Sequence, residues 1–427
     1  MGAPLKRSAD RHRTEEHLEE LARLADTAGA EVVGSLTQQL DRPHPATYLG
    51  KGKLEELKQR TSAEGASLVL FDDELSPAQG KNVEQAIGVR VMDRAELILD
   101  IFATRARSNE AKLQVELAQL QYMLPRLTRM WTHLEKFRGG IGMRGPGETQ
   151  LETDRRLINH RIRVLKERLE GVVRAREVQR AGREGAFRAA LVGYTNAGKS
   201  SILRGLSGQE VFVEDRLFAT LDPLTREVAL GQGLQALVTD TVGFVRKLPH
   251  QLVASFRATL EEAKEADLLL HVIDASHPQW EEQRAVVEDV VDEVGAGALP
   301  VLYVLNKTDQ LEPGLAEVFA NRFDAEGRQV VTVSAVTEGG LEPLRAALAD
   351  ALQRVRRVVE LRIPVADGRT LAVVRRLGEV LSEAYEGDVA VVRAVLEPRA
   401  IGQLERATGI DLRPVVQGPP RLEVPLP

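Results

Sequence analysis

A glycine-rich octapeptide near the middle of the chain places the strongest constraint on its fold. It reads Gly193-Tyr194-Thr195-Asn196-Ala197-Gly198-Lys199-Ser200, follows an apolar run at 188–192 and precedes a helical pattern at 201–206. The two glycines permit a tight turn whose N–H groups point at an anion from the positive end of the following helix. This strand, loop and helix predict an α/β sheet with a phosphate-binding site at its edge.

Two side chains at the end of this loop would carry the phosphate chemistry. Lys199 is expected to bridge the β- and γ-phosphates of a nucleotide and to act in catalysis, and the Ser200 hydroxyl is expected to bind Mg²⁺. A lone match of this kind can also be a glycine-rich turn that binds nothing. The surrounding sequence therefore has to decide between the two.

Composition limits the remaining choices. A chain of 427 residues with 43% apolar residues predicts two to four domains with ample cores. No run of about 18 apolar residues and no signal-peptide pattern occurs, so we expect a soluble, cytoplasmic protein. We also expect it to be a monomer when free. The absence of cysteine excludes disulfides and thiolate metal sites, and the eight histidines show no metal-ligand spacing.

Changes in pattern along the chain predict four domains. We expect an α/β subdomain at 1–105, a helical hairpin with a glycine-rich loop and linker at 106–185, a P-loop domain at 186–353 and a small α+β domain at 354–427. The expected strands of the P-loop domain lack polar alternation and are separated by helices, which favours a parallel sheet covered on both faces. The remaining expected elements are strands at 30–37, 67–71, 359–365 and 388–395 and helices at 14–29, 371–385 and 398–408.

The predicted hairpin is the basic part of an acidic protein. Apolar stripes predict two antiparallel helices, the first ended or kinked by Pro125 near Leu124 and the second spanning 151–178. Residues 101–190 hold 19 Lys/Arg and 10 Asp/Glu, whereas the whole chain has a net charge of −6. Six of the ten residues at 139–148, between the helices, are Gly or Pro. A polyanionic partner and a merely solvated hairpin fit this charge pattern equally well.

A second motif follows the apolar run at 234–239. It is Asp240-Thr241-Val242-Gly243, placed where the edge of a P-loop sheet presents an aspartate to a metal ion. Asp240 is expected to act on Mg²⁺ through water, and the Gly243 N–H is expected to sense the γ-phosphate and to assist catalysis. We therefore expect this tetrapeptide to be part of the nucleotide site.

A third motif lies between the phosphate loop and that strand, in Phe218-Ala219-Thr220-Leu221-Asp222. A threonine here can complete the Mg²⁺ shell only when the γ-phosphate is present, which makes the segment a candidate switch. Thr220 is the expected ligand and catalytic residue, and Thr225 is a weaker candidate for the same role. The expected metal ligands are thus Ser200, Thr220 and Asp240.

Two motifs near the end of the P-loop domain indicate the base. Asn306-Lys307-Thr308-Asp309 follows the apolar run at 300–305, and Ser334-Ala335-Val336 follows the next expected strand. The Asp309 carboxylate could accept paired hydrogen bonds from N1–H and N2–H₂ of guanine, donors that adenine lacks, while the second motif would close over the base through its backbone. Four motifs in order, each in its structural context, make GTP the expected ligand.

These motifs resemble those of the translation-factor-related GTPases, and the wider match resembles the HflX family of ribosome-associated GTPases. The run Gly142 to Arg156 (GMRGPGETQLETDRR) is similar to that family's hallmark, and the likeness extends through 71–77, 193–200, 218–222 and 240–262. The resemblance implies an N-terminal family domain with a long helical hairpin, a central GTPase domain and binding to the large ribosomal subunit. It also implies splitting or rescue of stalled ribosomes under stress, with Arg144, Arg155 and Arg156 as candidate RNA contacts.

Phe244 bears on the rate of hydrolysis. It occupies the position after Asp-x-x-Gly where Ras-like enzymes keep the glutamine that orients the attacking water, and a phenyl ring cannot orient water. We therefore expect slow intrinsic GTP hydrolysis, completed by a partner. Two alternatives remain: a nucleotide-gated ribosome- or RNA-binding module with negligible turnover, and an ATP-driven rRNA remodeller, which Asp309 disfavours.

Overall fold

A computed structural model of the chain describes residues 1–3, 13–130, 146–181, 186–209, 217–218, 221–231, 234–248, 262–355, 357–396 and 404. The fold divides into two compact units. Unit 1 contains Met1–Val173, Glu214–Asp222 and Val242–Thr259, and unit 2 contains Arg174–Val213, Pro223–Thr241 and Leu260–Pro427. Two short segments from the P-loop region of the sequence thus belong with the N-terminal part of the chain.

The N-terminal part of unit 1 is a small α/β layer. Its elements are α1 (Thr14–Thr27), α2 (Lys51–Ala63), β1 (Leu68–Phe71), α3 (Pro77–Ile87), β2 (Arg90–Asp93) and α4 (Arg94–Arg105). β1 and β2 are parallel, and the Met1 ammonium group donates to the Leu70 carbonyl at 2.6 Å. The strand expected at 30–37 is wrong: the segment makes one isolated bridge, from Thr37 to Gly2, and Val32 and Val33 are about half exposed. Among the described residues, a single bridge does not make a ladder.

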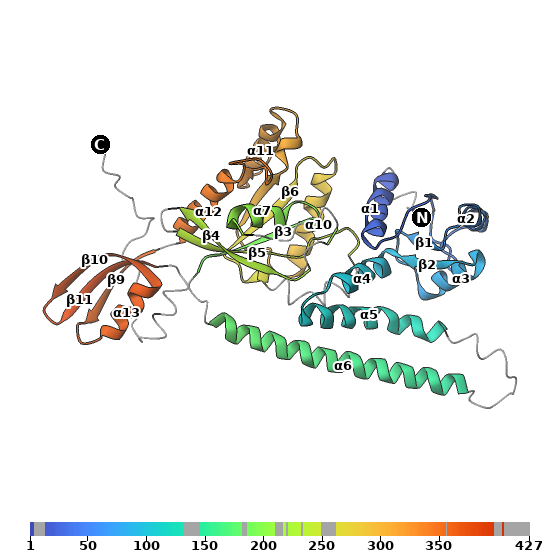
Figure 1. Ribbon diagram of the computed structural model, residues 1–427, viewed down its shortest axis with the longest axis horizontal. Helices are drawn as coiled ribbons and strands as arrows, with labels where there is room; N and C mark the ends of the chain where they lie inside the picture. Colours follow the sequence, from blue (N-terminus) through green and yellow to red (C-terminus); the bar gives the residue numbers. More distant parts are fainter. Residues whose placement is uncertain are drawn as a thin grey trace. The chain divides into compact units, whose positions relative to one another are not determined.

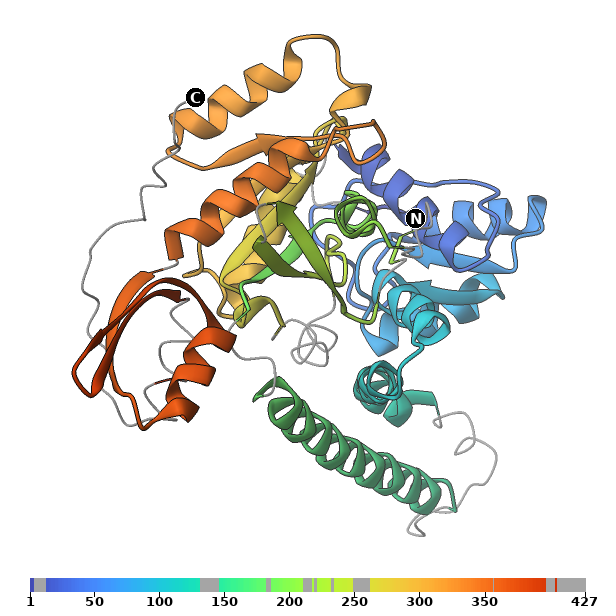
Figure 2. The ribbon, with the colours of Figure 1, turned by 60° about the vertical axis from the view of Figure 1, so that its left-hand side comes forward.

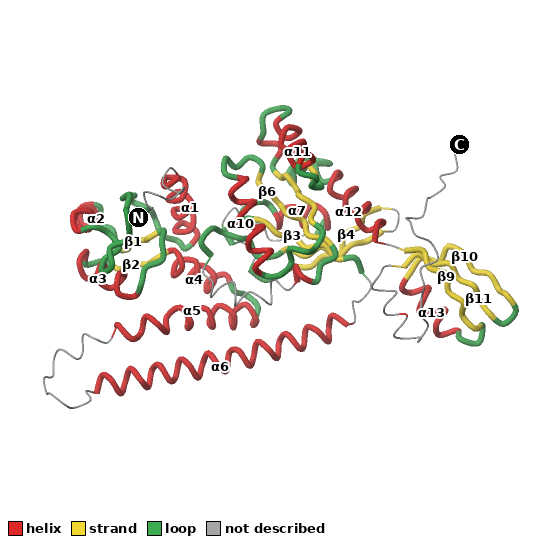
Figure 3. The backbone as a smooth tube through the Cα atoms, turned by 180° about the vertical axis from the view of Figure 1, so that it is seen from behind, coloured by secondary structure: helices red, strands yellow, loops and turns green. Residues whose placement is uncertain are grey.

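The helical hairpin consists of α5 (Asn109–Met130) and α6 (Pro146–Ala181), which run side by side in Figures 1 and 3. Arg161 of α6 donates to both carboxylate oxygens of Glu116 on α5, at 2.6 and 2.8 Å. Of the two outcomes expected at Pro125, an end or a kink, the end is wrong, because α5 continues through Pro125 to Met130. Tyr122 and Arg126, on either side of the proline, both bond the Asp93 carboxylate, and these contacts hold the helix in place on both sides of Pro125.

The sheet of unit 2 has the order β4-β5-β3-β6-β7-β8. Its strands are β3 (Arg188–Gly193), β4 (Leu224–Gly231), β5 (Leu234–Asp240), β6 (Leu268–Asp274), β7 (Val301–Asn306) and β8 (Val330–Thr332). All neighbours pair in parallel except β4, which is antiparallel to β5. The five expected strands are therefore parallel, as predicted, and β4 is an antiparallel edge strand that was not predicted. A link of two residues between β4 and β5 permits only a hairpin.

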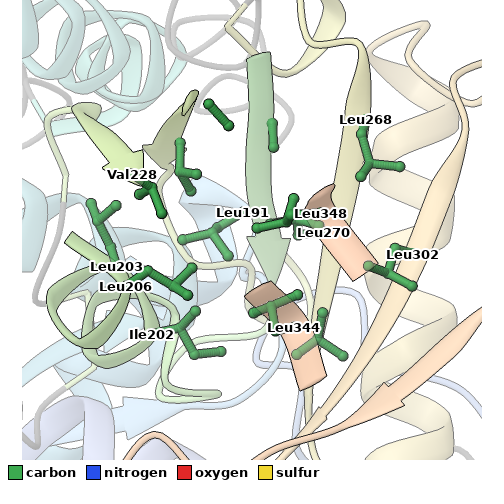
Figure 4. Close-up of a cluster of buried hydrophobic side chains, with 14 of the residues drawn as sticks. Leu191, Ile202, Leu203, Leu206, Val228, Leu268, Leu270, Leu302, Leu344 and Leu348 are labelled. Atoms are coloured by element: carbon green, nitrogen blue, oxygen red, sulfur yellow. The ribbon is translucent and has the colours of Figure 1, made fainter. Parts of the chain in front are cut away.

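Helices cover both faces of this sheet, as expected. They are α7 (Lys199–Ser207), α10 (Trp280–Glu293), α11 (Leu315–Ala325) and α12 (Glu342–Val355), with a 3₁₀ turn at Thr308–Gln310. Leucines of α7 and α12 meet Leu191, Leu270 and Leu302 of the sheet in one buried cluster, shown in Figure 4. On the other face, Trp280 and Phe323 pack with Tyr303 and Leu305. These two layers hold the carboxyl ends of the strands in place.

The C-terminal part of unit 2 contains β9 (Arg357–Pro364), α13 (Gly368–Leu377), β10 (Gly378–Glu386) and β11 (Val389–Leu396), seen in Figure 2. The sheet order is β10-β11-β9, and both pairings are antiparallel. The helix expected at 371–385 is wrong in its second half, which is β10. A Cβ on Gly378 would lie 2.6 Å from the Val395 carbonyl oxygen, so this glycine lets β10 pair closely where the helix ends. The helix expected at 398–408 lies outside the described residues, except for the buried Leu404.

None of the helices in the described part of the chain is both long and apolar enough to span a bilayer.

Candidate functional site

The glycine-rich loop joins β3 to α7, as expected, and its two glycines are required by close contacts. A Cβ on Gly193 would lie 2.3 Å from the Val272 carbonyl oxygen of β6. Gly198 has φ +97°, and a Cβ there would lie 2.1 Å from the side-chain nitrogen of Asn306. Neither distance tolerates another residue, so the sheet and the glycines together shape the loop.

Lys199 and Ser200 begin α7 at the end of this loop. The Lys199 ammonium group is buried and donates to the carbonyls of Gly193 and Tyr194, at 3.1 and 2.9 Å. Burial lowers the pKa of Lys199 to about 8, although the nearby Asp240 carboxylate opposes this shift. Because the Lys199 ammonium group already lies at the phosphate loop, it can contact a bound phosphate with little rearrangement.

Ser200 and Asp240 are brought together as the sequence predicts. The Ser200 hydroxyl donates to the Asp240 carboxylate at 2.6 Å, and Asp240 is fully buried at the end of β5. Its neighbour Thr241 donates to the Leu191 carbonyl of β3 at 2.7 Å, which fixes the end of the strand. The pair supplies a hydroxyl and a carboxylate, the hard oxygen donors that Mg²⁺ prefers.

The expected base-binding motifs lie at the ends of β7 and β8. The Asn306 amide donates to the Ala197 carbonyl at 2.8 Å and accepts from the Ala335 N–H at 3.2 Å. Asn306 therefore ties the phosphate loop to the loop that follows β8. The Ser334 hydroxyl donates to the Asp309 carboxylate at 2.6 Å, and this bond orients the carboxylate.

Lys307 and Thr308 stabilise the same end of the sheet. Lys307 has φ +63°, and its ammonium group pairs with the Asp274 carboxylate at 2.6 Å. The Thr308 hydroxyl donates to the Val333 carbonyl at 2.9 Å. Lys307 thus bonds the end of β6 and Thr308 bonds the residue after β8, and both contacts support the positions of Asp309 and Ser334.

The remaining predicted residues of the phosphate loop differ in exposure. Tyr194 and Thr195 are buried, whereas Asn196 is exposed with φ +61°. Val336 is 73% exposed beside the base-binding loops. Thr225, the weaker candidate for the switch threonine, faces Thr239 on β5, with 2.9 Å between the two hydroxyl oxygens.

The chain passes from unit 2 to unit 1 within the Asp240–Gly243 motif. Val242, Gly243 and Phe244 are buried in unit 1, and they begin a segment at 242–248 that we call the second switch segment. The Arg246 carbonyl accepts from the Arg94 guanidinium at 3.0 Å, and Lys247 pairs with the carboxylates of Asp72 and Asp73, at 2.9 and 2.6 Å. Two residues that follow Gly243, Arg246 and Lys247, are thus held by one hydrogen bond to a carbonyl and two ion pairs.

Asp72 is the centre of this ionic cluster. Its carboxylate receives Arg94 at 2.8 Å, Lys247 at 2.9 Å and Arg246 at 3.6 Å, and Arg94 also pairs with Glu20 at 2.7 Å. Burial of Asp72 opposes its ionisation, but the three cations outweigh burial and lower its pKa to about 2. The cluster joins α1, the end of β1, α4 and the second switch segment.

The first switch segment, residues 217–222, makes its contacts with the corner between α4 and α5. The ring of Phe218 packs on that of Phe102, with 4.6 Å between centroids, and both are buried. The Asp222 carboxylate accepts from the N–H of Ser108 at 3.1 Å and from its hydroxyl. Leu221 is buried as well, whereas the predicted Ala219 and Thr220 lie outside the described residues.

Sequence reasoning missed Arg94, Phe102 and Ser108, because each is separated from its partner by more than a hundred residues. A serine before a helical pattern is a capping signal, but it names no distant acceptor. Of the candidate RNA contacts, Arg155 and Arg156 are exposed on α6, and Arg144 lies outside the described residues.

The sheet order, the glycine loop, the Ser200–Asp240 pair and the oriented Asp309 define a P-loop GTPase. Three family models match in order: "GTP-binding GTPase N-terminal" at 15–103, "GTP-binding GTPase Middle Region" at 105–183 and "50S ribosome-binding GTPase" at 188–307. The chain belongs to the HflX family of GTPases and is a GTP-hydrolysing enzyme. This confirms the resemblance seen in the sequence.

Relatives match over most of the chain. A GTPase HflX from Caldanaerobacter subterraneus is 47% identical over 89% of this chain and 87% of its own length. The GTPase HflX of Escherichia coli is 44% identical, over 90% of each chain. Among solved structures, a GTP-binding protein from Sulfolobus solfataricus in complex with GDP is 26% identical, covering 82% of this chain and 98% of its own, with a TM-score of 0.44.

Proposed function

We propose that this GTPase binds the large ribosomal subunit through the α5–α6 hairpin and, when GTP is bound, splits or rescues stalled ribosomes under stress. The observation that carries the proposal is the pairing of a guanine-nucleotide site with a basic hairpin in one chain. The match of residues 188–307 to the family described as a 50S ribosome-binding GTPase supports the choice of partner.

The charge on α6 is available for a polyanion. Arg155, Arg156, Arg163, Lys166 and Arg168 are exposed along the helix, while Arg161 is engaged with Glu116 of α5. Because Arg161 attaches α6 to α5, the exposed cations of α6 form a basic surface on the hairpin. Such a surface suits an RNA backbone, where each neutralised phosphate releases counterions.

Mg²⁺ fits the residues present. The described residues contain no group of three or more His, Cys, Asp or Glu side chains placed to bind a metal. A metal would therefore be held by the Ser200 hydroxyl, the Asp240 carboxylate and oxygens of the nucleotide, with Thr220 as the proposed additional ligand. Bound there, Mg²⁺ would neutralise charge on the β- and γ-phosphates during transfer to water.

Slow basal turnover follows from Phe244. Its side chain is 1% exposed, so the position that follows Gly243 supplies a packing group. Lys199 and the Gly243 N–H remain to stabilise charge on the γ-phosphate, while the attacking water must be oriented by another group. A ribosome that completes the site would raise GTP hydrolysis. Replacing Phe244 by Gln tests whether the missing amide alone limits the basal rate.

Sedimentation of ribosomes tests the proposal. With the protein and a non-hydrolysable GTP analogue, we expect intact ribosomes to give way to subunits with the protein on the large one, and no such change with GDP. The double variant Arg155→Ala/Arg156→Ala should lose most of this binding, and Arg322→Ala, on α11, is the matched control. Binding should also weaken steeply with added salt.

Three results would contradict the proposal. Ribosome association that is equal with GDP, with the analogue and without nucleotide would remove the switch. Hydrolysis of GTP that ribosomes leave unchanged would show that Phe244 has no partner there, and equal competition by ATP would contradict the assigned role of Asp309.

A further inference from the structure

The turn at the end of β6 bonds residues on both sides of Asp309. The Asp274 carboxylate pairs with the Lys307 ammonium group at 2.6 Å, and the Ser276 hydroxyl lies 3.1 Å from the side-chain oxygen of Gln310. Lys307 and Gln310 stand shortly before and directly after Asp309 in the chain. The backbone that carries this carboxylate is therefore held from the neighbouring strand.

Asp274 is itself fixed by two kinds of contact. One of its carboxylate oxygens accepts from Lys307, and the other accepts from the N–H and the hydroxyl of Ser276, at 3.1 and 2.6 Å. The bond to the N–H two residues further on is the Asx turn, which holds an aspartate against its own backbone. Rotation of the Asp274 carboxylate would break all three contacts, and the side chain is only 12% exposed.

Lys307 needs this support because its backbone lies in the left-handed region. Its φ is +63°, and it directly precedes the 3₁₀ turn Thr308–Gln310, which contains Asp309. A residue other than glycine is uncommon in this region and stays there only where its surroundings hold it. The left-handed residue lets the chain leave β7 and enter the 3₁₀ turn at once, so its conformation sets where Asp309 lies.

We propose that Asp274 is a positioning residue for guanine selectivity, because its ion pair with Lys307 holds the left-handed turn that presents the Asp309 carboxylate to the base. The inference rests on the proposed function in one respect: Asp309 is taken as the acceptor for N1–H and N2–H₂ of guanine. Without the ion pair, Lys307 relaxes towards ordinary backbone conformations, and a base that bonds Asp309 must restore the turn when it binds. A base that makes no bond with Asp309 does not meet this cost.

Binding of GDP, IDP and ADP to the full-length protein tests this role. At N1 and N2, the three bases offer two, one and no N–H donors, respectively. In Asp274→Asn, the affinity for GDP should fall about tenfold, the population cost of a left-handed lysine without support, and the affinity for ADP by less than about twofold. The loss for IDP should lie between these values. A merely structural defect would weaken all three nucleotides by the same factor.

Lys307→Gly separates the role of the ion pair from its contribution to folding. Glycine adopts the left-handed backbone without support, so in the Lys307→Gly background Asp274→Asn should change the GDP affinity by less than about twofold. Glu281→Gln is the matched control, because it breaks a 2.7 Å ion pair with Arg322 in the same unit and should leave all three affinities unchanged.

Ser276→Ala covers the case in which Asp274→Asn fails to fold. It removes one of the bonds that fix Asp274, so it should give a smaller loss that is again largest for GDP and smallest for ADP. If the variants weaken the three nucleotides equally or not at all, or if the loss persists in the Lys307→Gly background, the inference is wrong and the role of Asp309 stands. Equal affinity of the wild type for GDP and ADP would contradict the role of Asp309, and the inference with it.

Discussion

Replacing Asp72 by Asn should destabilise unit 1 by about 3 kcal/mol. The Asp72 and Arg94 side chains are 5% and 2% exposed, so the substitution leaves a buried guanidinium without its partner at 2.8 Å. Removing one member of a buried pair costs about 3–5 kcal/mol, and the lower end applies because Glu20 still pairs with Arg94. The same cations lower the pKa of Asp72 from 3.8 to about 2, which agrees in direction with this loss.

Native-state hydrogen exchange and thermal unfolding measure this loss. The free energy of opening should fall for amides of β1 and α4, and amides at 245–247 should exchange faster, because Lys247 loses one of its two carboxylates. Asp73→Asn is the matched control: the Asp73–Lys247 pair is partly exposed, and such pairs contribute about 1 kcal/mol or less. Equal losses in the two variants would refute the central role of Asp72.

The same reasoning sets a pH dependence for the wild-type protein. Because the folded-state pKa of Asp72 is lowered, its contribution is present above the unfolded-state value near 4 and is lost as the pH falls towards 2. Asp72→Asn should lack this acidic loss. If the variant loses as much stability between pH 4 and 2 as the wild type, other carboxylates determine this loss.

Three further predictions concern unit 2. Asp309→Asn should weaken GTP binding at least a hundredfold, since two charge-assisted hydrogen bonds to guanine are each worth about 1.5–3 kcal/mol. Calorimetric titration with GTP measures this affinity, and a value within threefold of wild type would contradict the role assigned to Asp309. Gly198→Ala should abolish nucleotide binding, because its Cβ would lie 2.1 Å from the Asn306 amide, whereas Gly171→Ala, in open space on α6, should leave binding unchanged and stabilise the helix by up to about 1 kcal/mol. Burial lowers the pKa of His271 to about 3, so the folded protein keeps this imidazole neutral below pH 6.5, where the unfolded chain protonates it. The free energy of unfolding should therefore fall below pH 6.5, by at most about 1.4 kcal/mol per pH unit. In His271→Leu, the free energy of unfolding should depend less on pH between 6.5 and 4. A variant whose stability falls with acid as much as that of the wild type would exclude His271 as the cause.

The parts of the site that sequence predicted are those that depend on local order. The glycine loop, Ser200, Asp240 and Asp309 each follow a buried strand, and parallel strands bring their carboxyl ends to one edge, so order along the chain becomes proximity in space. The structure places Ser200 against Asp240 and Asn306 against the glycine loop accordingly. The domain bounds at 105, 185 and 353 and the metal role of Thr220 stay predictions.

The errors arose where a neighbour overrides local pattern. Pro125 should end or kink a helix, and α5 does not end there, because Tyr122 and Arg126 bond Asp93 on both sides of the proline. Residues 378–385 carry a helical apolar pattern, yet they pair with β11, and ladder hydrogen bonds outweigh a marginal helix preference.

By itself, the sequence determined a P-loop GTPase site and a basic hairpin, because motif spacing and strand periodicity are local properties. The HflX family followed from the resemblance of its motifs to a known family. Only the tertiary structure decided what holds the two switch segments. The Asp222 carboxylate accepts from Ser108, the residue that precedes α5, and Arg246 and Lys247 join a cluster around Asp72. Such contacts link residues more than a hundred positions apart, and an isolated aspartate or serine carries no sign of which distant partner the fold will bring to it.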